Sequence, residues 1–137
     1  EVFGEGRAPL EGFHALIMVL NSPRAELHAR IAIRTRAMFD AGLVEEVRGL
    51  LRTGVPKDAK AFESIGYKQA LAELDGTLTR EQAIELTTIA TRQYAKRQVT
   101  WYRQEANIHW LSGFGGDEGV RAEAKSLIDS YYTTPRL

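Results

Sequence analysis

Two short apolar segments, far apart in the sequence, constrain the fold more than any other feature. The first, at 14–20, is an apolar run typical of a strand that is buried on both faces of a sheet. The second, at 107–111, places Ile-His-Trp-Leu directly after Asn107. Two short strands alone do not make a stable sheet. We therefore expect both to belong to a parallel sheet whose other strands lie upstream, which makes this chain a piece of a larger protein.

The rest of the chain predicts helices, so we expect a mainly α fold. Glycines at 42, 54 and 76 mark the ends of the first three helices. Thr79 with Gln82 three residues later is a capping-box pattern, which predicts the start of a long fourth helix. We treat the 137 residues as one segment with helices at about 23–41, 43–53, 62–74, 80–104 and 118–131.

Composition excludes several classes of protein. Eighteen basic residues balance eighteen acidic ones, so any electrostatic function must come from local asymmetry. Cysteine is absent, which excludes disulfides and thiolate metal sites. No apolar run approaches the ~20 residues that span a bilayer, and we expect a cytoplasmic protein without membrane contact. His14, His28 and His109 lack metal-ligand spacing, so we predict no metal site on this chain.

The clearest charge asymmetry lies at 91–104, where three Arg and one Lys occur without an acid and with Tyr94, Trp101 and Tyr102 between them. Basic groups contact phosphates, and aromatic rings stack on unpaired bases, so this pattern favours an RNA-binding helix. A solvated helix face with Tyr94 and Trp101 in the core is the alternative. The pattern is suggestive of RNA binding without being specific for it.

A second basic cluster lies in the first predicted helix, where Arg30 and Arg34 are one turn apart. Two guanidinium groups at this spacing can hold an oligophosphate through forked hydrogen bonds. Two alternatives are open: Arg30 pairs with Glu26, and Arg34 pairs with acids of another helix. Spacing alone does not decide between phosphate binding and these ion pairs.

These residues also carry a resemblance to a known family. The segments LHARIAIR at 27–34, SIGYKQ at 64–69 and TRQYAKRQVTWYR at 91–103, in this order, resemble the C-terminal portion of the tRNA dimethylallyltransferases, also called tRNA isopentenyltransferases. The resemblance implies the helical part of a P-loop-type α/β enzyme. Such an enzyme transfers the dimethylallyl group of dimethylallyl pyrophosphate to N6 of the adenosine 3′ of the anticodon.

The chain departs from the family pattern in one large respect. Family members have an N-terminal phosphate-binding loop and an early Asp thought to act as the base, and neither is present in this sequence. The expected Mg²⁺ would therefore find its ligands outside this chain, in the missing N-terminal part of the same enzyme. We predict that the chain alone is inactive and that the complete enzyme is a monomer.

The resemblance also assigns residue roles. Arg34 is implied to reach the pyrophosphate, where it would stabilise charge on the leaving group, and Arg30 is the second candidate. Contacts with the tRNA anticodon stem-loop are implied for Lys57, Lys60, Thr91, Arg92, Lys96, Arg97 and Arg103. Gly66 is interpreted as a packing position. Two other functions stay open: a non-catalytic helical RNA-binding module and a related prenyltransferase acting on free adenine nucleotides.

Overall fold

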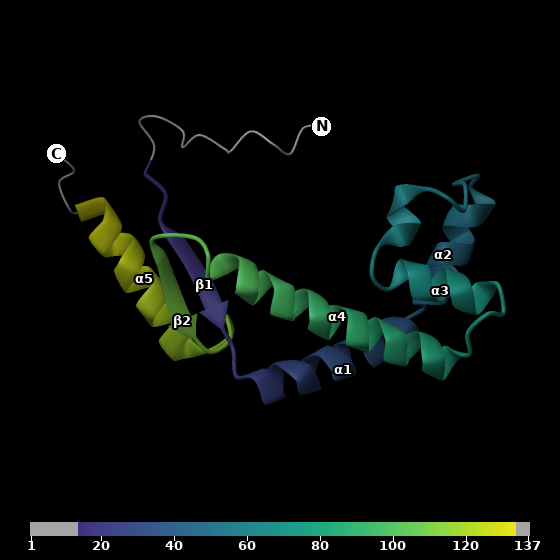
Figure 1. Cartoon of the computed structure of the whole chain (residues 1–137), viewed down its shortest axis with the longest axis horizontal. Coiled ribbons are helices and arrows are strands. Elements are labelled where there is room, and N and C mark those ends of the chain that lie inside the picture. Colours follow the sequence, from purple (N-terminus) through teal and green to yellow (C-terminus); the bar gives the residue numbers. More distant parts are fainter. Residues whose placement is uncertain (1–13, 134–137) are drawn as a thin grey trace. The chain divides into compact units, whose positions relative to one another are not determined.

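The computed structural model describes residues 14–133, which divide between two compact units (Figure 1). Of the described residues, the first unit combines 14–21 with 105–133, and the second contains 22–104. The prediction of a mainly helical chain with two short strands is confirmed. Among the described residues, no helix combines the length and the apolar character needed to cross a membrane.

The two predicted strands pair directly with each other. Strand β1 spans Ile17–Asn21 and β2 spans Ile108–Ser112, and they run parallel with Ile17 opposite Ile108. Helix α5, Glu118–Thr133, contacts β2. Leu111 and Val120 are buried in this unit, and the Tyr131 hydroxyl donates a hydrogen bond to the carbonyl of His14. The two predicted strands are therefore confirmed as neighbours in a parallel sheet, which has two strands among the described residues.

The second unit contains four α-helices and one short 3-10 helix. Helix α1 spans Arg24–Asp40, α2 spans Leu43–Arg52, α3 spans Tyr67–Leu74 and α4 spans Arg80–Tyr102. The 3-10 helix η1 covers Lys60–Glu63. The predicted capping box is present at the start of α4, because Gln82 N donates to Thr79 Oγ1 at 3.3 Å and Thr79 N donates to Gln82 Oε1 at 2.9 Å.

The third predicted helix, 62–74, is interrupted in the structure. The backbone leaves η1 after Glu63 and re-enters a helix only at Tyr67. Gly66 takes a φ of 98° at this break, a value that side chains with a Cβ rarely adopt. Gly66 is buried, and a Cβ there would meet Leu43 Cδ2 at 3.7 Å, an ordinary van der Waals distance, so its surroundings agree with a packing position while the backbone conformation is what favours glycine.

The core of the second unit forms where α2, α3 and η1 meet the end of α1 and the beginning of α4 (Figure 1). Its buried residues are Phe39, Leu43, Val44, Val47, Phe62, Ala70, Ala83 and Ile84. Beyond this core, α1 and α4 continue alongside each other. The buried residues of α4, Ala83, Ile84, Thr87 and Thr88, all precede residue 90, so the second half of this helix lies outside the core.

Candidate functional site

A cavity of about 640 Å³ lies in the second unit, beside the second half of α4. Three segments supply its walls: α1, the end of η1 with the loop after it, and α4. The lining residues are Ile31, Arg34, Thr35, Met38, Glu63, Ser64, Ile65, Thr87, Thr91, Tyr94 and Arg97. The cavity therefore brings together one residue from each of the two basic sequence clusters, Arg34 and Arg97.

Arg34 is a predicted site residue that the fold leaves available. Its side chain is exposed and lines the cavity. Within residues 14–133, neither a hydrogen bond nor an ion pair engages this guanidinium group. The alternative in which Arg34 pairs with an acid of another helix does not occur among these residues, although the Glu63 side chain lines the same cavity. A guanidinium group in this setting can bind a phosphate through forked hydrogen bonds.

Arg30 lies one turn before Arg34 but takes a different role. Its Nη2 lies 2.7 Å from Glu26 Oε1 and its Nε lies 3.1 Å from the same oxygen. The alternative in which Arg30 pairs with Glu26 is thus confirmed. Both side chains are about half exposed, so the pair is solvated and contributes little to stability. A phosphate would have to compete with Glu26 for Arg30, which makes Arg34 the better placed of the two.

The basic residues of α4 do not share one face. Arg92 turns toward α1, where its Nη2 donates a hydrogen bond of 3.3 Å to the carbonyl of His28. Its Nε is fully buried and has no hydrogen-bond partner among the described residues. Arg97 lies on the cavity side, with its guanidinium carbon 5.7 Å from the ring centroid of Tyr94. Five residues separate the two, which is about 140° around a helix.

The contact with Arg92 has an electrostatic consequence for α1. The pKa of His28 lies below its ordinary value, first because the imidazole is partly desolvated and then because Arg92 and Arg24 disfavour a second positive charge nearby. The imidazole is therefore held more firmly in its neutral form. The hydrogen bond to the His28 carbonyl places Arg92 in the packing of α1 against α4, and its predicted contact with tRNA stays a prediction.

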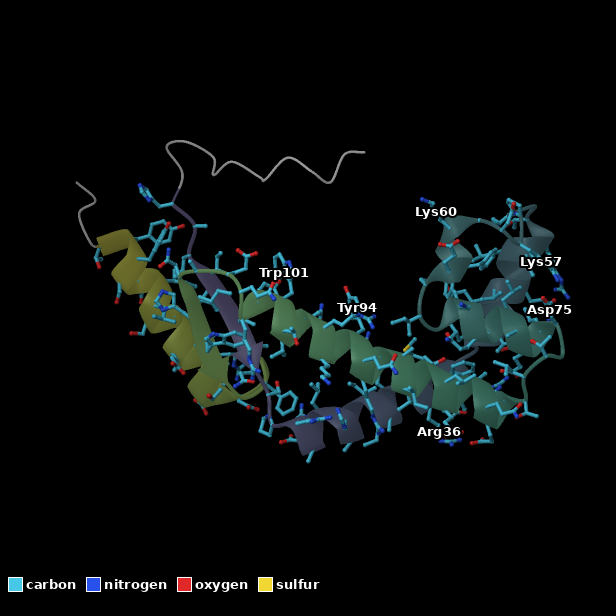
Figure 2. All side chains as sticks on the ribbon, in the orientation of Figure 1. Arg36, Lys57, Lys60, Asp75, Tyr94 and Trp101 are labelled. Carbon is cyan, nitrogen blue, oxygen red and sulfur yellow. The ribbon has the colours of Figure 1, made fainter. Side chains whose placement is uncertain are left out.

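Thr91 and the remaining basic residues of the second unit occupy several places. Thr91 lines the cavity, and its hydroxyl donates to the carbonyl of Thr87 at 2.8 Å. Lys96 and Arg103 are exposed on α4 or directly after it. Lys57 pairs with Asp75, whereas Lys60 is exposed and carries no ion pair to the described residues (Figure 2). These positions bring Thr91 and Arg97 into the cavity with Arg34, while Lys57 and Arg92 are engaged elsewhere.

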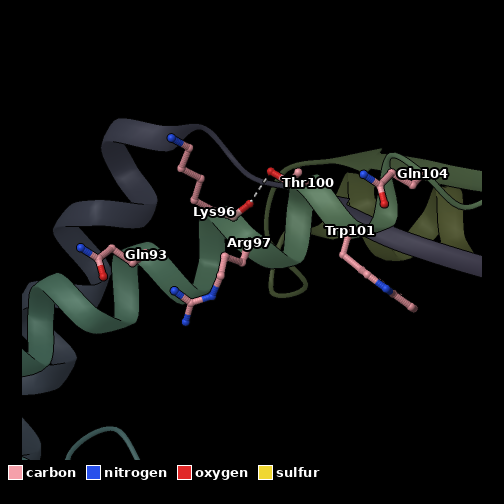
Figure 3. Close-up of a pocket in the computed structure, with 6 residues that line it drawn as sticks. All are labelled: Gln93, Lys96, Arg97, Thr100, Trp101 and Gln104. Carbon is pink, nitrogen blue, oxygen red and sulfur yellow. Dashed lines mark hydrogen bonds between the residues drawn. The ribbon is translucent and has the colours of Figure 1, made fainter. Parts of the chain in front are cut away.

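A second, more open hollow of about 560 Å³ continues along α4 (Figure 3). Its lining consists of Gln93, Lys96, Arg97, Thr100, Trp101 and Gln104. Arg97 lines both cavities, so the two are neighbours along the helix. Tyr94 and Trp101 are 49% and 51% exposed, which contradicts the alternative that places these two rings in the core.

Sequence reasoning did not assign several of these positions. Glu63 and Ser64 enter the cavity from the break between η1 and α3, which the predicted continuous helix did not contain. The SIGYKQ segment was the available signal, because it begins at Ser64. Tyr94 and Trp101 stand out in the sequence as aromatic residues within a basic segment. Their seven-residue spacing is the further signal, because it puts both rings on one face of a helix.

The described residues offer no ready place for a divalent ion. Within 14–133, no group of three or more His, Cys, Asp or Glu side chains could hold a metal. Mg²⁺ prefers carboxylate oxygens and phosphates as ligands, and the cavity with Arg34 supplies one carboxylate, from Glu63, beside two guanidinium groups. The described residues therefore do not fit a Mg²⁺ site of their own.

Comparisons with known proteins agree on one family. A family model described as "IPP transferase" matches residues 3–105. The chain is 46% identical over 132 residues to a tRNA dimethylallyltransferase of Koribacter versatilis, covering 93% of this chain and 41% of the relative. It is 40% identical over 131 residues to the protein of the same name from Solibacter usitatus, covering 96% of this chain and 43% of that relative. The chain thus spans less than half the length of these curated relatives.

Solved structures point the same way. The full-length tRNA isopentenylpyrophosphate transferase of Bacillus halodurans matches with a TM-score of 0.71 and 32% identity, over 85% of this chain and 40% of that one. The tRNA delta(2)-isopentenylpyrophosphate transferase of Staphylococcus epidermidis matches with a TM-score of 0.73 and 32% identity, over 84% of this chain and 38% of that one. Taken with the family model, these similarities show that the chain belongs to the IPP transferase family.

Proposed function

We propose that this chain is part of a tRNA dimethylallyltransferase, which transfers a dimethylallyl group from dimethylallyl pyrophosphate to N6 of the adenosine 3′ of the anticodon. Family membership supports the reaction class. The observation that carries the assignment to this part of the enzyme is the cavity that combines Arg34 with Thr91 and Arg97. A guanidinium group can bind a pyrophosphate, and hydroxyl and guanidinium groups can bind an RNA backbone, so this lining supports both proposed roles.

The chemistry assigns Arg34 a role in the transition state. The N6 nitrogen of adenine forms a bond to C1 of the dimethylallyl group, the bond from C1 to the pyrophosphate oxygen breaks, and N6 loses a proton to a base outside this chain. Negative charge grows on the leaving pyrophosphate as this bond breaks. A guanidinium group positioned for that charge lowers the barrier more than it tightens ground-state binding. Arg34 is therefore the proposed catalytic residue, with Arg30 as the second candidate.

Contacts with the anticodon stem-loop form the other half of the proposal. Thr91, Lys96, Arg97 and Arg103 lie at or near the second half of α4, and Lys60 is an exposed cation at the start of η1. Lys57 and Arg92 belong to the same proposed surface, although their present partners are Asp75 and His28. Phosphate contacts of this type position an RNA without reading its sequence.

The complete reaction needs parts beyond this chain. We propose that a longer protein supplies the phosphate-binding loop, the base and the Mg²⁺ ligands, and that Mg²⁺ there neutralises charge on the pyrophosphate. We also propose that this protein is a cytoplasmic monomer. Residues 1–137 mixed with dimethylallyl pyrophosphate, Mg²⁺ and an unmodified anticodon stem-loop should yield no N6-prenylated adenosine by nucleoside mass spectrometry. Turnover by the isolated chain would refute this division of the machinery.

The proposed function itself is tested in the longer protein. That protein should form the prenylated adenosine, and Arg34→Ala should abolish most of the rate. Arg48→Ala is a matched control, because Arg48 is an exposed arginine of α2 paired with Glu45 and lies outside the cavity. RNA binding without transfer in the unsubstituted longer protein would instead favour the non-catalytic RNA-binding module. Prenylation of free adenine nucleotides in preference to the stem-loop would favour a related prenyltransferase that acts on such nucleotides.

A further inference from the structure

We propose that Trp101 is a stacking platform for an unpaired base of the RNA loop, and that this base belongs to a different nucleotide from any that occupies the cavity with Arg34. This inference rests on the proposed function and extends it to a second nucleotide subsite. It begins from an exposed aromatic pair on α4. Tyr94 and Trp101 are 49% and 51% exposed, and both project from the same side of the helix (Figure 2).

The spacing of these two rings separates their ligands. Seven residues are almost two helical turns, so the side chains share a face, and their Cα atoms lie ~10 Å apart along the axis. One base cannot cover both rings at this separation. Tyr94 lines the cavity that contains Arg34, whereas Trp101 lines the neighbouring hollow. A strand that places one nucleotide in the first cavity would therefore bring a different nucleotide to Trp101.

Arg97 connects the two subsites. It lines both cavities, and in Figure 3 its side chain lies on the same side of α4 as Trp101. Its guanidinium carbon is 5.7 Å from the centroid of the Tyr94 ring. This position lets Arg97 bind the phosphate between the two nucleotides, since an arginine can use its planar face toward an aromatic ring and its N–H edge toward an anion.

The lining of the hollow matches a nucleotide in charge and in hydrogen bonding. Lys96 and Arg97 are cationic, and none of the lining residues is acidic. Gln93 and Gln104 carry amides, which can both donate to and accept from a base edge. The indole of Trp101 has Tyr102 as a neighbour, with ring centroids 4.7 Å apart and an interplanar angle of 74°. This edge-to-face contact orients the indole, which stays 51% exposed.

Another part of the longer protein is the competing occupant. A protein cover would bury Lys96 and Arg97 with the indole, and each buried cation would then need an acidic partner. Because the segment from 91 to 104 contains no acid, the covering segment itself would have to supply an acid for each cation. An RNA strand supplies the negative charge on every nucleotide, together with a π-face for the indole. The charge pattern therefore favours RNA over a protein cover.

Intrinsic fluorescence gives a direct test, because the chain contains two tryptophans. Trp110→Phe leaves Trp101 as the sole reporter. Titrating this variant of the full chain with an anticodon stem-loop should quench the Trp101 emission, since stacking on a base brings the indole into van der Waals contact with it. An unquenched signal at RNA concentrations that saturate binding would overturn the inference.

Affinity measurements do not depend on the Trp110 substitution. With a labelled stem-loop, Trp101→Leu should weaken binding roughly 5- to 150-fold, the range for losing one stacked base, and Trp101→Phe should weaken it less. The salt dependence should stay unchanged, because an indole carries no charge. Tyr132→Leu is the matched control: Tyr132 is an aromatic residue of α5 that is 82% exposed, and its loss should leave the affinity as it was.

Replacing single loop nucleotides by abasic ones identifies the partner of Trp101. One abasic position should weaken binding by the unsubstituted chain and have no further effect on Trp101→Leu. If Arg97→Gln weakens binding while Trp101→Leu does not, the inference is overturned and the proposed function survives. If the unsubstituted chain and every variant fail to bind the stem-loop, the proposed RNA contacts and this inference fall together.

Discussion

The two halves of α4 belong to one continuous helix but differ in what surrounds them. Ala83 and Ile84 in the first half belong to the hydrophobic core. The second half has no buried residue among those described and exposes Tyr94 and Trp101. The first half is therefore shaped by burial, and the second half presents basic and aromatic groups. A single helix can in this way be anchored at one end and free for binding along the other.

Threonines mark the passage from one half to the other. Thr87 and Thr88 are buried, yet their hydroxyl groups donate to the carbonyls of Ala83 and Ile84 at 2.7 and 2.8 Å. These bonds to the preceding turn satisfy the hydroxyl donors, so burial leaves them with a partner. Thr91 repeats the bond one turn later and lines the cavity. The polar lining thus begins where the apolar core ends.

The largest expected difference between the two halves of α4 is in how much a substitution lowers the free energy of unfolding. Ile84→Ala should lower the free energy of unfolding by ~2 to 5 kcal/mol, because it removes buried methyl groups and leaves a cavity. Trp101→Ala should lower it by only ~1 kcal/mol, because half of the indole is already exposed. Urea unfolding followed by circular dichroism measures both. A loss above ~2 kcal/mol for Trp101→Ala would mean that the second half is packed and not free.

Catalysis should depend on the residue of α1 that faces the second half of α4 across the cavity. In the longer protein, Arg34→Ala should cost ~2 to 4 kcal/mol of transition-state stabilisation, because a guanidinium group aimed at developing charge is lost. Single-turnover rates at saturating substrates measure this change. The Arg48→Ala variant should keep the rate, and a rate that stays equally high for Arg34→Ala would assign Arg34 another role.

Salt dependence should distinguish the two sides of α4. If Arg97 binds a phosphate, Arg97→Gln should make the slope of log affinity against log salt shallower by about 0.7 to 0.9, because one fewer counterion is released. Arg92 donates to the carbonyl of His28, a bond that a phosphate contact would have to replace, so Arg92→Gln should flatten the slope less than Arg97→Gln does. Equal flattening by both substitutions would show that both sides of the helix contact RNA, as the family resemblance predicts.

The smallest expected effect is on the pKa of His28, a residue of α1 whose carbonyl accepts a hydrogen bond from Arg92 of α4. Arg92→Gln should raise the pKa of His28, because one repelling charge disappears, but not to its ordinary value, because desolvation is the larger cause. Proton NMR titration measures the pKa, and a His28→Gln sample assigns the resonance. A pKa unchanged by Arg92→Gln would mean that Arg92 is not held beside His28 in solution.

The sign of the linked stability follows from the same shift. The folded pKa of His28 lies below the unfolded value, so protonation favours the unfolded chain. The contribution of His28 to stability is therefore complete above the unfolded pKa of about 6.5 and is lost as the pH falls through the folded pKa. Arg92→Gln should reduce this loss, which acid titration of the unfolding free energy can detect.

Local sequence determined most helix boundaries of this protein. Thr79 and Gln82 satisfy backbone and side-chain groups within a few residues of each other, so the start of α4 needs no tertiary contact. The predicted helix at 80–104 ends at Tyr102 in the structure. The helix predicted at 23–41 is one residue shorter at each end, and the one predicted at 43–53 is one residue shorter at its C-terminal end. Helix ends are local events, which is why the sequence was sufficient for them.

The break between η1 and α3, in contrast, depends on contacts with other elements of the fold. The segment at 62–74 has a helical pattern, but Phe62 is buried in the core while Gly66 approaches Leu43 of α2. These contacts with other elements compete with a continuous helix, and tertiary packing overrides local propensity. The same holds for the strands: the sequence located β1 and β2, but their direct parallel pairing joins residues about ninety positions apart.

The sequence by itself determined the family, the helical character and the presence of two basic clusters, because each depends on residue types at short spacing. Only the tertiary structure decided which members of those clusters are available. Arg30 turns to Glu26 and Arg92 to α1, whereas Arg34 and Arg97 line one cavity. Each arginine has the same charge in the sequence, and its availability depends on the groups that packing places beside it.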